Sequence, residues 1–187
     1  FDILQKIILQ SKIRGLHSFG YSYYDNNVLK TIKEHKIKQI KFPITNKLIF
    51  HNRYSTSGDY KNHINNQPID LKDISLVFNG VIDMRTKEEM QEYYNIEMTT
   101  DNDGEIPLQL YGNDYQKIAD FIKNIKGSFA GLMLTQNKLL AIRNANRPAW
   151  VLKLHESIFI ASTKDIFKRV NQNFEPIELE SNKLYEY

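Results

Sequence analysis

Cysteine is absent from the 187-residue sequence. This absence excludes disulfide bonds and thiolate metal sites, and it also excludes a cysteine nucleophile within these residues. A chain without cysteine suits the reducing conditions of the cytosol, so we expect a cytoplasmic protein. We expect neither a metal ion nor a cofactor in its site.

Long apolar runs are also missing. No run approaches the roughly 18 to 20 residues that span a bilayer, and the first residues show no cleavable signal with a small-residue exit site. We therefore expect a soluble protein without a membrane partner. The sequence has no internal repeat, glycine/serine linker or low-complexity tract, so we expect a single domain over residues 1–187.

Charge of one sign is not gathered into any long block. Lysine and arginine total 25 against 22 acidic residues, which gives a net charge of +3. The densest basic stretch is "KTIKEHKIKQIKF", Lys30 to Phe42, where apolar residues and one glutamate separate the lysines. This stretch can contact phosphates, but a solvated helix face explains it more simply. A nucleic-acid-binding function is therefore only our third choice.

The remaining composition is that of an ordinary folded protein. Hydrophobic residues make up 41% of the sequence and charged residues 25%, which is close to the average for globular domains. A domain of this size buries about 70% of the surface that its unfolded chain exposes. The chain is thus long enough for one full hydrophobic core.

The spacing of apolar residues predicts several helices. The first runs from the start of the chain to Gly15, a residue suited to the left-handed position after a helix. A second is predicted from Val28 to about His35, because Asp25-Asn26-Asn27 is typical of a turn that begins a helix. Further helices are predicted in "TKEEMQEYYN", in "DYQKIADFIKNIKG" and near Lys164 to Val170.

Short runs rich in β-branched and aromatic residues predict strands. They are "SFGYSYY", "KLIFHNRY", "ISLVFNGVI", "SFAGLMLT", "KLLAIRN", "AWVLKLH", "SIFIAST" and a last pair around "FEPIELE" and "KLYEY". "TQNK" and "HES" are short enough to join their neighbours as antiparallel hairpins. Helices and antiparallel strands together predict an α+β fold with layered sheets.

Polar residues gather at the ends of predicted strands, where a rigid sheet can aim side chains at one point. Arg53 offers a planar fork for a carboxylate, and Asp103 offers a negative charge for an ammonium group. Asn79 and the Gly80 amide offer two hydrogen-bond donors for a developing oxyanion. These groups match an amino acid whose side-chain carbonyl is attacked by a nucleophile.

Each of these residues also has a purely structural interpretation. Arg53 can form a surface ion pair, and the polar stretch from His51 to Ile69 can be an ordinary loop. Asn79-Gly80 is the commonest dipeptide of type I′ hairpin turns. Asp103, within "DNDGE", can simply form a turn. The order in which the motifs occur is what favours the functional interpretation.

That order resembles the class II glutamine amidotransferase domain of the N-terminal nucleophile hydrolases, nearly from end to end. The matching segments are "RGLHSFG", "HNRYSTSG" with Gln67-Pro68 downstream, Asn79-Gly80 in "LVFNGVI", Asp103-Gly104-Glu105, "IKGSFAGLML", "RNANRPAW" and "IASTKD". Each segment is a weak signal alone, but their shared order is specific. The resemblance implies a four-layer αββα sandwich of two antiparallel sheets with helices outside.

The resemblance also implies roles for individual residues. Arg53, with help from Thr56, is expected to bind the α-carboxylate of glutamine, and Asp103 its α-amino group. The Asn79 side chain and the Gly80 amide are expected to form the oxyanion hole. Tyr54, Ser55 and Gln67 to Ile69 then form the scaffold of a substrate-binding wall.

One departure from the family affects the chemistry. The family's nucleophile is a cysteine at the mature N-terminus, whereas this sequence has no cysteine and begins at Phe1. Either a cysteine-bearing first strand precedes Phe1 in the natural protein, or the fold has lost its chemistry. Because Arg53, Thr56, Asn79, Gly80 and Asp103 are all present, we favour a preceding strand.

The resemblance implies hydrolysis of L-glutamine to glutamate, with the ammonia supplied to an acceptor-activating enzyme. Since 187 residues leave no room for a synthase domain, we expect that enzyme on another chain. The alternative is an inactive glutamine-binding or scaffolding module that regulates a partner. The sequence does not identify the ammonia acceptor.

Overall fold

The computed structural model describes residues 2–37, 42–54 and 59–187. The helices are α1 (Asp2–Gln10), α2 (Lys87–Tyr94), α3 (Glu105–Tyr111), α4 (Tyr115–Asn124) and α5 (Lys164–Val170), with short 3₁₀ helices η1 (Ser11–Arg14) and η3 (His63–Asn65). The strands are β1 (Ser18–Asp25), β2 (Val28–Glu34), β3 (Leu48–Arg53), β4 (Ile69–Leu71), β5 (Ile74–Val81), β6 (Ser128–Leu134), β7 (Leu139–Arg143), β8 (Trp150–Leu154), β9 (Ser157–Ala161), β10 (Ile177–Glu178) and β11 (Tyr185–Glu186). The strand pairs of the described residues are antiparallel.

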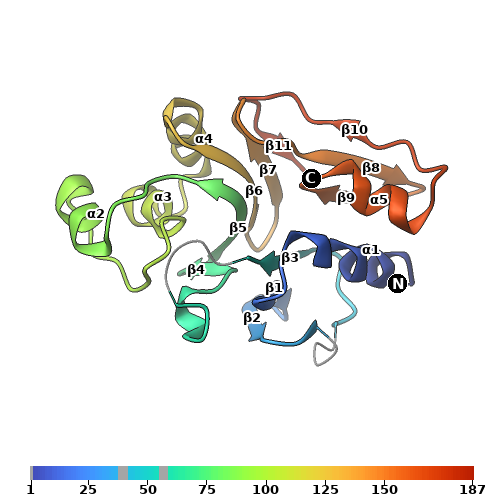
Figure 1. Cartoon of the computed structure of the whole chain (residues 1–187), viewed down its shortest axis with the longest axis horizontal. Helices are drawn as coiled ribbons and strands as arrows, with labels where there is room; N and C mark the ends of the chain where they lie inside the picture. Colours follow the sequence, from blue (N-terminus) through green and yellow to red (C-terminus); the bar gives the residue numbers. More distant parts are fainter. Residues whose placement is uncertain (1, 38–41, 55–58) are drawn as a thin grey trace.

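The elements stack in four layers (Figure 1). A central sheet has the strand order β11-β7-β6-β5-β4. One face of this sheet packs under α2, α3 and α4 in the largest apolar cluster, which contains Phe78, Ile106 and Ile118. The other face packs against a second β layer, and α1 and α5 cover the outside of that layer. The predicted α+β sandwich is therefore confirmed.

The second β layer is divided into two three-stranded sheets, with the orders β2-β1-β3 and β10-β8-β9. Ile49 of β3 packs on Val77 of the central sheet. Helix α1 bridges the two small sheets, because Ile8 packs with the first and Ile7 with the second. Within the described residues, β3 and β9 each have a single hydrogen-bonded neighbour. The predicted last pair of strands also separates, since β10 joins β8 and β11 joins β7.

The helix predicted from Val28 to about His35 is wrong. These residues form β2, which pairs with β1 in a hairpin whose register places Asp25 opposite Val28. Asn26 and Asn27 have φ angles of 48° and 65°, as a type I′ turn requires of both central residues. Lys30 and Lys33 of the predicted helix face therefore lie on a strand, Lys36 follows the end of β2, and Lys38 and Lys41 lie outside the described residues.

Gly15 follows the first helical segment as predicted, but for a different reason. Its φ of 161° is extended rather than left-handed. A Cβ atom at this position would lie 2.2 Å from the carbonyl carbon of Arg53, and the His17 amide donates to the Arg53 carbonyl at 3.0 Å. Glycine is thus needed because the backbone after η1 runs against the end of β3.

Helix α2 illustrates a boundary that the sequence encodes locally. Thr86 accepts from the Glu89 amide and the Glu89 carboxylate accepts from the Thr86 amide, which completes a capping box.

None of the helices in the described part of the chain is long and apolar enough to cross a membrane.

Candidate functional site

A cavity of about 1350 Å³ lies where the second β layer is divided. Residues 50–53 of β3 line one side and residues 157–161 of β9 the other. The floor is the central sheet, including Val77, Asn79 and Leu132, and the α1 residues Leu4 and Ile7 close one end. The cavity is thus an open cleft between two sheet edges.

Arg53 lies inside this cleft and not on the surface, because only 4% of it is exposed. Its Nη1 donates to the Asn66 Oδ1 at 2.6 Å, and the Asn66 Nδ2 donates in turn to the Tyr60 carbonyl at 2.8 Å. Burial lowers the pKa of Arg53, while the nearby carboxylates of Asp103 and Asp59 oppose that shift. The alternative of a surface ion pair for Arg53 is therefore wrong.

Asp103 lines the same cleft and is buried. Its Oδ2 accepts from the amides of Ile82 at 2.6 Å and Asp83 at 3.1 Å. Burial raises the pKa of Asp103, and these backbone hydrogen bonds partly counteract the rise. The turn itself is formed by Asn102, whose Oδ1 accepts from the Gly104 amide at 3.0 Å. The carboxylate of Asp103 thus braces the end of β5 beside Arg53.

Asn79 and Gly80 lie within β5 and not in a hairpin turn, so the turn alternative is wrong for this pair. Gly80 lies opposite Phe129 of β6. The Phe129 amide donates to the Asn144 Oδ1 at 3.0 Å, and the Phe129 carbonyl accepts from the Asn144 amide at 2.9 Å. Because both backbone groups of Phe129 are thus directed away from Gly80, the Gly80 amide points away from β6. On that same edge, the Phe78 amide donates to the Gln67 Oε1 at 2.6 Å. The Gly80 amide therefore lies between two N–H groups, of Phe78 and Ile82, whose partners are side chains.

The Asn79 side chain has a fixed orientation. Arg14 Nη2 donates to the Asn79 Oδ1 at 2.9 Å, so the amide nitrogen of Asn79 must point the other way. Asn79 and Val77 share the face of β5 that forms the cleft floor. The Asn79 nitrogen and the Gly80 amide are donors of the kind that stabilise an oxyanion.

His51 lies between the cleft and the central sheet. Burial, and then the positive charge of Arg53, lower the pKa of His51 to about 3. An interaction with the Phe78 backbone opposes this shift, and among the described residues the His51 Nδ1 is buried without a hydrogen-bond partner. His51 is therefore a neutral imidazole at physiological pH.

The structure brings four of the five predicted site residues together in one cleft: Arg53, Asn79, Gly80 and Asp103. Thr56, with the scaffold residue Ser55, lies outside the described residues. Sequence reasoning missed Arg14 and Asn66, which hold Asn79 and Arg53. Arg14 was visible only as part of the segment "RGLHSFG". No group of three or more metal-binding side chains occurs in the described ranges.

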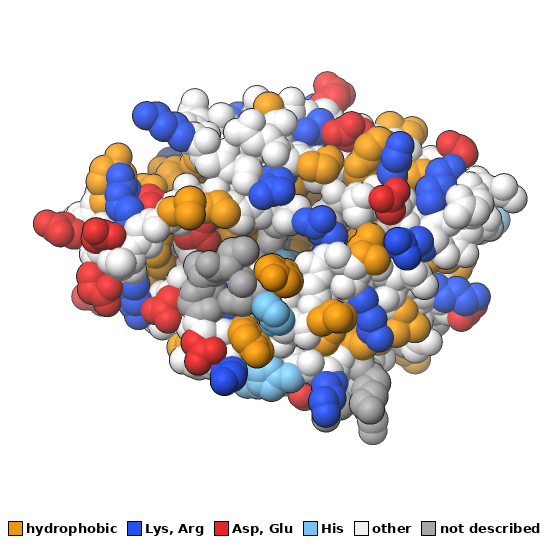
Figure 2. Space-filling model, viewed as in Figure 1, with side chains coloured by type: hydrophobic (Ala, Val, Ile, Leu, Met, Phe, Trp, Pro, Cys, Tyr) orange, Lys and Arg blue, Asp and Glu red, His pale blue; other side chains and the backbone are white. Residues whose placement is uncertain are grey.

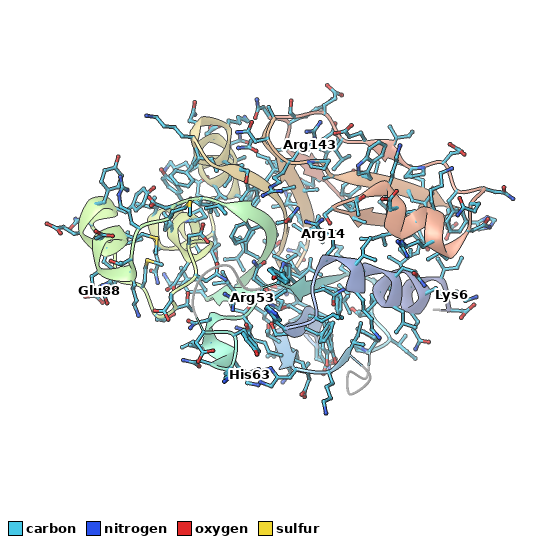
Figure 3. The ribbon with its side chains drawn as sticks, in the orientation of Figure 1. Lys6, Arg14, Arg53, His63, Glu88 and Arg143 are labelled. Atoms are coloured by element: carbon cyan, nitrogen blue, oxygen red, sulfur yellow. The ribbon has the colours of Figure 1, made fainter. Side chains whose placement is uncertain are left out.

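The charge around the cleft is predominantly positive. Basic residues that line it are Lys12, Arg14, Lys47, Arg53 and Arg147, and the acidic ones are Asp103 and Glu156. Figure 3 shows Arg14 and Arg53 near the centre of the molecule, far from the labelled Lys6 and Glu88 at its ends. Figure 2 shows lysine and arginine side chains in the middle of this face, whereas acidic side chains gather at the end near α2.

Two comparisons of the sequence with known proteins agree. The family described as "Glutamine amidotransferase domain" matches residues 51–169. The glutamine–fructose-6-phosphate aminotransferase (isomerizing) of Chlamydia trachomatis serovar D is 26% identical over 176 residues, which cover 80% of this chain and 29% of that protein. The chain thus spans less than a third of this relative.

Solved structures with the same fold were also found. Glutamine phosphoribosylpyrophosphate amidotransferase from B. subtilis has a TM-score of 0.75 at 17% identity, over 99% of this chain and 44% of that one. A predicted glutamine amidotransferase from Pseudomonas aeruginosa has a TM-score of 0.62 at 13% identity, over 91% and 84% of the two chains. A glutamine aminotransferase class-II domain protein from Silicibacter pomeroyi has a TM-score of 0.64 at 10% identity, over 90% and 86%.

Proposed function

The chain belongs to the glutamine amidotransferase domain family, class II, and on this premise we propose that it binds L-glutamine in the cleft and hydrolyses its side-chain amide. The observation that supports this best is the placement of Arg53, Asn79, Gly80 and Asp103 along one cavity. They come from β3, β5 and the turn before α3, segments far apart in the sequence.

Arg53 and Asp103 are proposed to hold the amino-acid end of glutamine. The Arg53 guanidinium is buried and positioned by Asn66, so it can present two parallel N–H groups to the α-carboxylate. The Asp103 carboxylate has one oxygen engaged by Ile82 and Asp83, and its other oxygen is proposed to accept from the α-ammonium group. Opposite charges at the two groups match the zwitterion.

Asn79 and Gly80 are proposed to act at the reacting carbonyl. When a nucleophile adds to the side-chain amide, the C=O π electrons move onto oxygen, and donors on that oxygen stabilise the anion. Collapse of the tetrahedral adduct breaks the C–N bond, and the proton given up by the nucleophile passes to the leaving nitrogen. Ammonia is released and an acyl intermediate remains. Water then hydrolyses this intermediate to glutamate and regenerates the nucleophile.

A strand between β3 and β9 is the proposed source of the nucleophile, since the sequence has no cysteine. In the part of the chain that the structure describes, both strands present an unpaired sheet edge to the cleft, and such an edge is a template for one more strand. The apolar floor residues Val77 and Leu132 suit the inner side chains of such a strand. A cysteine at its end beside Asn79 would complete the site.

The ammonia is proposed to reach an acceptor-activating enzyme on another chain. The proposal is supported by the similarity of this chain to a glutamine–fructose-6-phosphate aminotransferase, of whose length it spans 29%.

Glutamate release by the full natural protein tests the proposal, measured with and without candidate partner chains. Turnover that depends on a cysteine upstream of Phe1 supports the enzyme. Glutamine binding without turnover instead supports the alternative function, a glutamine-binding module that regulates a partner. Failure to bind glutamine contradicts both functions.

A further inference from the structure

The cleft contains two cationic side chains that the proposed glutamine site does not use as ligands. Arg14 and Arg147 both line it and are half-buried. Among the described residues, neither forms an ion pair with a carboxylate. By contrast, Arg143 in the same turn region pairs with Glu178 at 3.0 Å.

Their anchors place the two guanidinium groups close together. Arg14 Nη2 donates to the Asn79 Oδ1 at 2.9 Å, and Arg147 Nε donates to the Ser128 Oγ at 3.1 Å. Asn79 is paired with Ala130, two residues from Ser128 on the same strand. Asn79 and Ser128 are therefore diagonal neighbours on one face of the sheet, a relation that typically separates residues by about 7 to 8 Å.

Most hydrogen-bonding capacity of the pair is unused. A guanidinium carries five N–H donors, and in the described part of the chain the Arg14 and Arg147 groups each make one side-chain hydrogen bond, to a neutral oxygen. The nearby carboxylate of Asp103 interacts with Arg53 instead. Burial, and next the positive charge of Arg147, lower the pKa of Arg14. Two unneutralised cations in one cleft are unfavourable unless an anion joins them.

We propose that Arg14 and Arg147 form a binding subsite for an oxyanion group, a carboxylate or a phosphate, beside the oxyanion hole and separate from Arg53. The planar forks of two guanidinium groups suit an ion with several acceptor oxygens. The subsite takes the anionic group of a second molecule that enters the cleft. Its existence does not depend on glutamine hydrolysis.

Calorimetric titration of the full natural protein with inorganic phosphate and, separately, with acetate tests this subsite at constant ionic strength. We expect one of the two anions to bind the parent chain, and Arg147→Gln to weaken that binding about 10-fold or more, as for the loss of one charge-assisted contact. Arg147→Lys keeps the charge but loses the fork, so it should recover part of the affinity. Lys153→Gln is the matched control, because Lys153 is exposed on β8 and does not line the cleft.

The outcomes distinguish a phosphate site, a carboxylate site and the absence of a site. Phosphate binding that Arg147→Gln removes and Lys153→Gln retains supports a phosphate site, and the same pattern with acetate supports a carboxylate site. Equal weakening by both variants, or no binding of either anion to the parent at millimolar concentrations, overturns the proposal. A parallel glutamine titration keeps the two questions separate, because failure to bind glutamine contradicts the proposed function and leaves the anion result intact.

Discussion

The two β layers of this domain are built differently. The central sheet is continuous across its five strands and buries Phe129, Met133 and Leu140 completely under three helices. The second layer is divided, and polar or charged residues such as His51 and Arg53 lie where it opens. Burial of apolar area is the main source of folding free energy, so the continuous layer should determine stability and the divided layer binding.

The two faces of a single strand of the central sheet also differ, because one faces the helices and the other faces the cleft. Along β5, Leu76 and Phe78 face the helices, whereas Val77 and Asn79 face the cleft. Alternation along a strand thus lets one segment contribute to the core and to the site at once. Substitutions on the two faces should have separable effects.

The largest expected effect is on the continuous layer. Phe129 is fully buried and stacks on Phe78 with ring centroids 5.1 Å apart. Phe129→Ala should lower the free energy of unfolding by about 3 to 5 kcal/mol, measured by urea denaturation. Phe50→Ala, in the divided layer where the ring is half-buried and lines the cleft, should cost less than half as much. Equal losses would contradict the comparison.

The next prediction concerns the reacting end of the cleft. In the full natural protein, Asn79→Ala should lower kcat for glutamate release about 100-fold to 1000-fold, because one oxyanion donor is lost. The free energy of unfolding should change far less than in Phe129→Ala. Steady-state kinetics measures the effect, and a variant with unchanged kcat would remove Asn79 from the proposed chemistry.

Glutamine affinity tests the amino-acid end. Arg53→Ala should weaken glutamine binding roughly 10-fold to 150-fold, since a charge-assisted bidentate contact contributes about 1.5 to 3 kcal/mol. Arg53→Lys should recover only part of the loss, and Asp103→Asn should weaken binding comparably while keeping the shape. Arg169→Ala, on the exposed side of α5, is the control. Calorimetric affinities for Arg53→Ala within twofold of the parent would refute the assignment.

The smallest predicted effect is a pH dependence of stability from His51. The pKa of His51 is about 3 in the folded chain, against an ordinary value of 6.5, so the unfolded chain binds a proton at a higher pH than the folded chain does. The stability contribution of the neutral ring is therefore complete above about pH 6.5 and declines as the pH falls toward 3. His51→Gln should lessen that slope by up to about 1.4 kcal/mol per pH unit.

Denaturant titrations from neutral pH to about pH 5 measure this slope in both proteins. Other titrating groups contribute equally to the parent and the variant, so the difference between the two slopes isolates His51. Parallel pH profiles would show that His51 titrates alike in the folded and unfolded chains.

Local signals in the sequence predicted much of the fold. The apolar periodicity of α4 and the turns "TQNK" and "HES" indicated the correct elements. One exception is β2, because Asn26-Asn27 can begin a helix or form a type I′ turn, and only pairing with β1 decides between them. The division of the second layer could not be predicted either, because it depends on which strand edges remain unpaired.

The site residues that could be predicted are those whose side chain or backbone group has a distinctive chemical role. Arg53, Asn79, Gly80 and Asp103 were expected to lie together, and they line one cavity. Their supporting residues were not foreseen, since an asparagine such as Asn66 is one of several in a polar stretch and only its contact with Arg53 distinguishes it. The function of Arg14 likewise depends on a contact across 65 positions in the sequence.

The close approach of Gly15 to Arg53 links helix α1 mechanically to the cleft. Helix α1 leads through η1 into this contact, and the His17 amide secures it at the Arg53 carbonyl. We therefore expect a partner that displaces α1 to shift Arg53 as well. Thermodynamic linkage makes such coupling reciprocal: whatever factor the partner applies to glutamine affinity, glutamine applies to partner affinity. A partner on the outer surface of the domain would then bind with an affinity that depends on whether glutamine occupies the cleft.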